Sequence, residues 1–197
     1  MPQPLPLFPL NVVLVPGLVL PLHIFEPRYR GMVESLLSQP EAEAREFGIV
    51  GVRDGRSFDD DGIDAIYPVG TATLLREAER LPDGRYDIVT TGSRRFRVVS
   101  VDQSEPLAVA MVEFLDDEQG PDDAHYAQRV AREFNTYRQL LGGRLSTEDT
   151  SGASPEDLPK DPTVLSYLVT AAMVLPNAQR QELLAAADTQ TLSLIHI

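Results

Sequence analysis

Prolines interrupt an apolar stretch near the start of the chain, at a spacing that excludes one continuous helix. The stretch spans residues 5–25 and contains Pro6, Pro9, Pro16 and Pro21. Because proline has no amide N–H and its ring clashes with the preceding helical turn, a helix interior does not tolerate four of them. No basic residue precedes the stretch, so it predicts neither a membrane-spanning helix nor a signal peptide. We expect short strands instead, with prolines at sheet edges.

The first 115 residues predict a β-rich part with one early helix. Pro27 suits the first position of a helix, and apolar residues follow at helical spacing, so we expect a helix over 27–38. Turn residues such as Leu81-Pro82-Asp83-Gly84 and Gly92-Ser93 separate the β-rich runs. The expected strands are 11–15, 18–22, 47–52, 70–80, 86–91, 94–101 and 107–115. Closely spaced strands favour an antiparallel sheet or a small barrel.

The second part predicts helices. After an acidic loop at 116–123, apolar residues recur in steps of three and four over 127–141. Residues 143–160 predict a long loop, and Asp161 and Pro162 predict the N-cap and first residue of a deeply buried helix that ends by residue 175. A last helix is expected over 178–187. The fold class is therefore α+β, with a β-rich part at 1–116 and a helical part at 121–191.

Composition removes most catalytic chemistries. The chain has no cysteine, which excludes disulfides, thiol nucleophiles and zinc sites that use cysteine. Its one lysine, Lys160, follows no glycine turn, so neither a P-loop nor a Ser–Lys dyad is expected. The three histidines, His23, His125 and His196, have no metal-binding spacing. We therefore predict no catalytic residues, no cofactor and no metal.

Charge limits the partners. The sequence has 30 acidic and 17 basic residues, a net charge of −13, which opposes binding to nucleic acids and to anionic membranes. Arg94, Arg95 and Arg97 surround Phe96. We interpret this run as a strand whose arginines face solvent or pair with carboxylates, with Phe96 in the core.

Several motifs resemble the Lon protease N-terminal domain family. They are Leu5-Pro6-Leu7-Phe8-Pro9-Leu10, residues 12–17 and residues 20–30, with support at 48–52, 69–72, 84–89, 92–98 and 181–184. The resemblance implies a β-rich PUA-like pseudobarrel followed by a helical bundle, and a role in recognising protein substrates. In full-length Lon proteases an ATPase and a Ser–Lys peptidase follow this domain. Residues 86–91 and the 143–160 loop look more like the short bacterial members, so we interpret the chain as a stand-alone cytoplasmic, proteolysis-related member.

The resulting prediction is a non-catalytic module that binds unfolded or partner polypeptide, and neither nucleic acid nor membrane. The candidate contact residues are Phe25, Glu26, Arg28, Tyr29, Arg94 and Arg95. Two alternatives stay open: an N-terminal fragment of a full-length ATP-dependent Lon protease, and a PUA-like binder of a small molecule or nucleic acid. The oligomeric state is not predicted.

The last six residues, 192–197, read Leu-Ser-Leu-Ile-His-Ile. This hexapeptide is what a transposon-derived adaptor used in library preparation encodes when translated in frame. It is apolar and carries no helix-ending signal. We therefore expect that it is a non-native tail.

Overall fold

The computed structural model describes residues 1–116, 129–132, 134, 136 and 161–186, and the chain divides into two compact units. The first unit comprises Met1–Asp116 and Leu175–Ala185, and the second comprises Asp117–Val174 and Ala186–Ile197. The expected acidic loop after residue 116, the 143–160 loop and the 192–197 tail lie outside the described residues. No helix in the described part of the chain is both long and apolar enough to cross a membrane.

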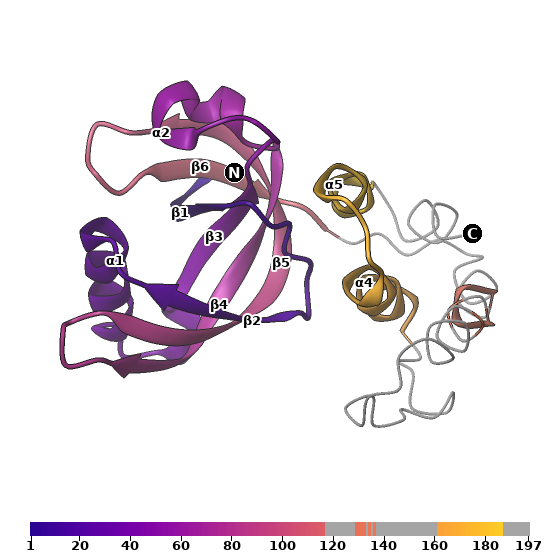
Figure 1. Cartoon of the computed structure of the whole chain (residues 1–197), viewed down its shortest axis with the longest axis horizontal. Coiled ribbons are helices and arrows are strands. Elements are labelled where there is room, and N and C mark those ends of the chain that lie inside the picture. Colours follow the sequence, from indigo (N-terminus) through magenta and orange to yellow (C-terminus); the bar gives the residue numbers. More distant parts are fainter. Residues whose placement is uncertain (117–128, 133, 135, 137–160, 187–197) are drawn as a thin grey trace. The chain divides into compact units, whose positions relative to one another are not determined.

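The first unit contains a closed β-barrel (Figure 1). Its strands are β1 (Gln3–Leu10), β2 (Val19–Ile24), β3 (Glu46–Gly51), β4 (Val69–Arg80), β5 (Tyr86–Asp102) and β6 (Val109–Phe114). They follow the order β2-β5-β4-β3-β1-β6, and β5 also pairs with β6. The last pairing closes β1, β3, β4, β5 and β6 into a ring. Strand β2 pairs with β5 outside this ring.

Strand β1 shows how the sheet tolerates prolines away from its edge. Residues 3–6 of β1 pair antiparallel with β6, and residues 7–10 pair in parallel with β3. Each half of the strand therefore pairs on one side only, and a proline whose nitrogen faces the other side removes no ladder hydrogen bond. The expectation of edge strands is right for β2, and β1 satisfies the same requirement while lying between two strands.

Two of the expected strand boundaries are wrong. Residues 86–102 form one strand, β5, without the expected break at Gly92-Ser93. Residues 11–15 form no strand. This segment crosses β5 closely: a Cβ placed on Gly92 would lie 2.6 Å from the carbonyl oxygen of Val15. Gly92 therefore permits close backbone contact within a continuous strand, and does not mark a turn.

The hairpin between β4 and β5 forms at the expected turn. The amide of Gly84 donates to the Leu81 carbonyl at 2.9 Å, and Gly84 has a φ of +82°. This left-handed conformation favours glycine. The turn fixes the pairing of β4 with the first half of β5.

Two apolar clusters form the core of the first unit. One cluster fills the ring and includes Leu7, Phe96 and Val112. The other lies between the sheet and helix α1 (Pro27–Leu37), whose Met32 and Val33 are buried. The expected helix at 27–38 is thus confirmed, with Pro27 as its first residue. Short helices η1 (Ala42–Ala44), α2 (Phe58–Asp61) and η2 (Gly62–Ala65) connect the strands.

The last helix, α5 (Asn177–Ala185), packs on the barrel. Gln181 Nε2 donates to the Val69 carbonyl at 2.9 Å, and Asn177 Nδ2 donates to the Asn11 carbonyl at 2.8 Å. This helix therefore belongs to the β-rich unit, although the sequence placed it in a helical part at 121–191. The difference arises because polar side chains of α5, the buried Gln181 and the partly buried Asn177, make contacts with the barrel in addition to the apolar ones.

In the second unit, α4 (Pro162–Ala172) begins where the sequence predicts. The Asp161 carboxylate accepts from the amides of Thr163 and Val164. The expected burial pattern is partly wrong, because Val164 and Leu168 are 51% and 41% exposed. Polar Thr163, Ser166 and Thr170 are buried on this helix together with Leu165, Tyr167 and Val169. The described residues of the expected 127–141 helix are helical.

Candidate functional site

A three-stranded arm extends from the barrel. It consists of β2, residues 86–91 of β5 and residues 75–80 of β4. One face of the arm packs against the α1 cluster, which includes Leu75, Tyr86 and Ile88. Because side chains alternate along a strand, the residues between these point to the opposite face, which we call the outer face.

The outer face carries two cross-strand rows. In the first row Pro21 pairs with Val89, and Val89 pairs with Glu77. The second row contains His23, Asp87 and Glu79, which pair in the same way. Each row therefore begins on the edge strand β2 and ends with a glutamate on β4.

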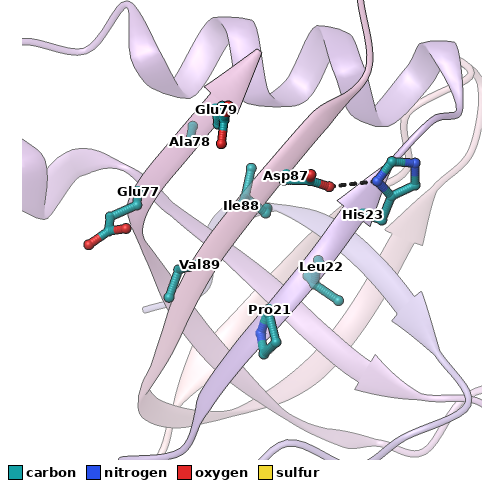
Figure 2. A pocket seen from close by; sticks show the side chains of 9 residues that line it. All are labelled: Pro21, Leu22, His23, Glu77, Ala78, Glu79, Asp87, Ile88 and Val89. Carbon is teal, nitrogen blue, oxygen red and sulfur yellow. Dashed lines mark hydrogen bonds and ion pairs between the residues drawn. The ribbon is translucent and has the colours of Figure 1, made fainter. Parts of the chain in front are cut away.

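A hollow of about 490 Å³ lies over these rows (Figure 2). Its volume falls in the range of about 300–1,000 Å³ that is typical of ligand pockets. Figure 2 shows its lining residues on three adjacent strands: Pro21, Leu22, His23, Glu77, Ala78, Glu79, Asp87, Ile88 and Val89. Ile88 packs in the α1 cluster, and Leu22 and Ala78 pack against it. The floor is therefore sheet backbone, and the walls are the side chains of the two rows.

Hydrogen bonds fix the imidazole of His23. Its Nδ1 lies 2.6 Å from Oδ1 of Asp87, and its Nε2 lies 3.1 Å from Nη1 of Arg85. A guanidinium can only donate, so Nε2 accepts and the proton is on Nδ1, which donates to Asp87. Arg85 also pairs with Asp83 at 2.7 Å, and the backbone amide of Arg85 is the main cause that lowers the pKa of Asp83. The arrangement orients His23 and occupies one carboxylate of the hollow.

The other two carboxylates of the hollow, Glu77 and Glu79, are exposed. Among the described residues, neither Glu77 nor Glu79 makes an ion pair within 4.0 Å. No arginine or lysine among the described residues lines the hollow. No group of three potential metal ligands occurs in the described part of the chain. The hollow is thus negatively charged along β4 and apolar at Pro21 and Val89.

Large apolar side chains are exposed at the two ends of β2. Phe25 follows β2 directly and is 61% exposed, and its ring stacks on that of His23 with centroids 6.4 Å apart. Val19, at the other end of β2, is 55% exposed. Among the described strands only β5 pairs with β2, so the outer edge of β2 has no strand partner there. An exposed edge strand with apolar side chains is a common site for the addition of another chain.

The alternation of hydrogen-bonded pairs between β2 and β5 explains why a proline is tolerated at position 21. The Gly92 amide donates to the Leu18 carbonyl, which places alternate residues of β2 in hydrogen-bonded pairs with β5. Val19, Pro21 and His23 are the intervening residues, and their backbone groups point toward the free edge. Pro21 therefore costs the ladder no donor, and it removes one donor from the edge itself.

Of the residues expected to bind polypeptide, Glu26 and Arg28 form a separate ion-pair group. Arg28 donates to both carboxylate oxygens of Asp59, at 2.7 and 3.0 Å, and to Glu26 at 2.9 Å. The hydrogen bonds with Asp59 are the main cause that raises the pKa of Arg28 and lowers that of Asp59. The guanidinium also lies 5.0 Å from the Tyr29 ring centroid. These contacts occupy Arg28 within the chain and fix the start of α1 to α2.

Tyr29 and Arg95 offer no accessible side chain. Tyr29 is buried against Phe8, with ring centroids 4.2 Å apart, and burial is the main cause that raises the pKa of its hydroxyl. Arg95 is 2% exposed, and its Nη1 donates to the Leu184 carbonyl at 3.0 Å. The expectation that Arg95 faces solvent is therefore wrong. Both residues have packing roles in the first unit.

Arg94 is exposed but engaged. Its guanidinium lies 3.5 Å from the Phe114 ring centroid, and Nη2 lies 3.2 Å from Oε2 of Glu46. None of its described contacts is with Phe25, Glu26 or Arg28. None of the six expected contact residues lines the hollow, and Phe25 is linked to it through its ring contact with His23. Sequence reasoning missed Glu77, Glu79 and Val89, whose alternation in the sequence indicates a shared face but whose proximity depends on strand register.

The fold is thus a small closed β-barrel with an added edge strand, joined to helices. The sequence model of the ATP-dependent protease La (LON) substrate-binding domain matches residues 4–192, so the chain belongs to this family. The α+β class and the resemblance seen in the sequence are confirmed.

Relatives and solved structures agree with this assignment. The Lon protease of Cytophaga hutchinsonii is 32% identical over 59% of this chain and 14% of its own length. Lon protease 2 of Syntrophobacter fumaroxidans is 26% identical over 100% of this chain and 24% of its own length. The chain therefore spans a quarter or less of these relatives.

The crystal structure of a Lon N-terminal domain protein from Xanthomonas campestris superposes with a TM-score of 0.68 at 24% identity, covering 98% of this chain and 96% of that one. The N-terminal domain of the Mycobacterium avium complex Lon protease superposes with a TM-score of 0.69 at 16% identity and the same coverage. Both structures share the fold over nearly the whole of each chain.

Proposed function

We propose that this chain binds unfolded or extended polypeptide through the outer face and free edge of the arm, without a cofactor or metal. The observation that carries the proposal is the exposure of Val19 and Phe25 at the two ends of an edge strand, in a family of substrate-binding domains. An extended peptide that adds to a strand edge gains backbone hydrogen bonds and places apolar side chains against such neighbours. Of the six contact residues predicted from the sequence, Phe25 is the one that is central to this proposal.

The role is one of binding and not of catalysis. The sequence offers no P-loop or Ser–Lys dyad, and the described residues contain no metal-ligand cluster. We therefore expect the chain to hydrolyse neither ATP nor casein. The acidic composition favours a polypeptide partner over nucleic acid or a membrane surface. We expect a cytoplasmic location, in line with the family. The same binding role fits a stand-alone protein and the substrate-recognition part of a longer protease.

A matched pair of valine variants tests the location. Fluorescence anisotropy would measure the binding of a labelled, permanently unfolded protein to the wild type, to Val19→Ser and to Val99→Ser. Val99 lies in β5 outside the arm and is 49% exposed, close to Val19 in residue type, secondary structure and exposure. We expect Val19→Ser to weaken binding by roughly tenfold, since burial of such a side chain contributes about 1.5 kcal/mol.

The control variant should bind as the wild type does. An equal loss in both variants would place the binding surface elsewhere. No saturable binding of the wild type up to high micromolar concentration would contradict the proposed function itself. The variant Phe25→Ser provides a second probe of the same surface and should also weaken binding.

A further inference from the structure

We propose that the hollow on the outer face selects cationic polypeptide segments, in which a lysine or arginine lies next to an apolar residue. This inference rests on the proposed function and specifies its substrate class. It begins from the lining of the hollow, which contains three carboxylates, one imidazole and no arginine or lysine. Asp87 is already held by His23, so Glu77 and Glu79 are the carboxylates left for a partner.

The two glutamates lie on the same face of one strand, two residues apart. That spacing puts their backbone positions about 7 Å from each other. Like charges at this distance repel, and both side chains are exposed without a cation of their own in the described part of the chain. A guanidinium or ammonium group placed between them would relieve the repulsion and pair with both. The group that complements the charge of the two glutamates is therefore a cation.

The apolar part of the hollow lies beside the acidic part. Val89 pairs with Glu77 on one side and with Pro21 on the other, and neighbouring strands are about 4.8 Å apart. A segment that crosses the three strands can place an apolar side chain over Pro21 and Val89 while the adjacent cationic side chain reaches Glu77 and Glu79. The volume of about 490 Å³ accommodates more than one side chain. Geometry and charge thus favour the same occupant.

Arg28, Arg94 and Arg85 are not available to bind an acidic partner, because each already pairs within the chain. Arg28 pairs with Asp59 and Glu26, and Arg94 pairs with Glu46 and stacks on Phe114. Arg85 contacts Asp83 and His23. These guanidinium groups pair within the chain, whereas the two glutamates of the hollow form no ion pair with a residue that the structure describes. The net charge of −13 acts in the same direction and raises the local concentration of cationic segments.

Two labelled peptides and two double variants test the inference on the full chain. The peptides are unstructured and apolar and differ only in having arginine or glutamine at three positions. The variant Glu77→Gln/Glu79→Gln removes the two charges from the hollow. The control Glu105→Gln/Glu182→Gln removes two exposed charges elsewhere, so it matches the change in net charge.

We expect the wild type to bind the arginine peptide about five- to tenfold more tightly than the glutamine peptide at low salt, because each exposed ion pair contributes up to about 1 kcal/mol. The preference should disappear in Glu77→Gln/Glu79→Gln and persist in the control. It should also weaken at high salt, since exposed charges are screened.

Equal binding of the two peptides by the wild type, or an unchanged preference in Glu77→Gln/Glu79→Gln, would overturn the charge selection and leave the proposed polypeptide binding intact. Failure of both peptides, and of the unfolded protein, to bind the wild type would overturn both proposals. These two kinds of failure are therefore distinguishable in one set of titrations.

Discussion

The two compact units of the chain differ in the sequence pattern on which the contacts within each unit depend. In the β-rich unit, β1 pairs with β3 and with β6: Leu7 lies opposite Gly48, and Leu5 lies opposite Ala110. In the helical unit, the described apolar cluster joins Val130 and Phe134 to Leu165 and Val169, two pairs at i,i+4 spacing. The first unit therefore depends on strand register, and the second on helical periodicity.

Buried polar groups are satisfied differently as well. Thr170 in α4 donates to the carbonyl of Ser166 within the same helix at 2.8 Å. In the β-rich unit, Thr71 donates to the Leu14 carbonyl at 2.7 Å, 57 residues away in sequence. Substitutions in the β-rich unit should therefore act on elements that are distant in the sequence. Those in α4 should act locally.

The largest effect is expected for Phe96→Ala. Phe96 is fully buried in the ring, and a Cβ placed on Gly48 or Gly70 would lie within 3 Å of its aromatic ring. Loss of a buried phenylalanine from such a site costs about 3–5 kcal/mol, a large part of the stability of a typical domain. Urea unfolding monitored by circular dichroism should show this decrease in the free energy of unfolding.

A substitution in the other unit provides the comparison. Leu165→Ala removes a buried side chain from the α4 cluster and should leave the hydrogen-exchange protection of β1 to β6 unchanged. If Leu165→Ala lowered protection in the barrel strands as much as in α4, the two units would unfold together. The distinction between them would then be wrong.

An effect of intermediate size is expected for Arg95→Met. Its guanidinium joins β5 to α5 through the Leu184 carbonyl and also lies 3.4 Å from the carbonyl of Asp116. Hydrogen bonds from a charged donor contribute about 1.5–3 kcal/mol, so Arg95→Met should destabilise the β-rich unit by about that amount. Hydrogen exchange should locate the main loss of protection in α5. The exposed neighbour Arg97, changed to Met, is the control, and a loss of the same size there would argue against the role of Arg95.

Local signals in the sequence predicted the helix starts and the hairpin. Pro27 and Asp161 act within one turn of their own positions, and the Leu81–Gly84 turn is set by residues next to each other. Chemistry that acts over a few residues can be identified without knowing the rest of the fold.

Non-local contacts account for the errors. Gly92 has turn chemistry in the sequence, but its role is to let residues 15 and 16 cross a continuous strand. Arg95 looks like part of a basic surface patch, but α5, almost 90 residues later, covers it. The alignment of Glu77 and Pro21 on either side of Val89 depends on register across three strands. The pattern of residues along a strand predicts which side chains share a face. Only the pairing between strands determines which of these side chains are adjacent.

The smallest effect is expected at the ion pair of Arg28 and Asp59, which joins α1 to α2 within the β-rich unit. The Asp59 side chain is 61% exposed, so the pair should contribute less than about 1 kcal/mol, and Asp59→Asn should cost no more than that at pH 7. The hydrogen bonds from Arg28 lower the pKa of Asp59 in the folded chain. The contribution is therefore fully present above the unfolded value of about 4 and disappears as the pH falls through the lower folded pKa.

Urea unfolding of the wild type and of Asp59→Asn should accordingly give a small difference in the free energy of unfolding at pH 7, which decreases as the pH falls below the unfolded value of about 4. Asp60→Asn is the matched control, because Asp60 is the exposed neighbour and forms no ion pair in the described part of the chain. The hydrogen-exchange protection of α4 should be the same in all three proteins, since the pair lies within the β-rich unit. A difference between wild type and Asp59→Asn that grew as the pH fell would contradict the direction of the pKa shift, and a response in α4 would show that the two units are coupled.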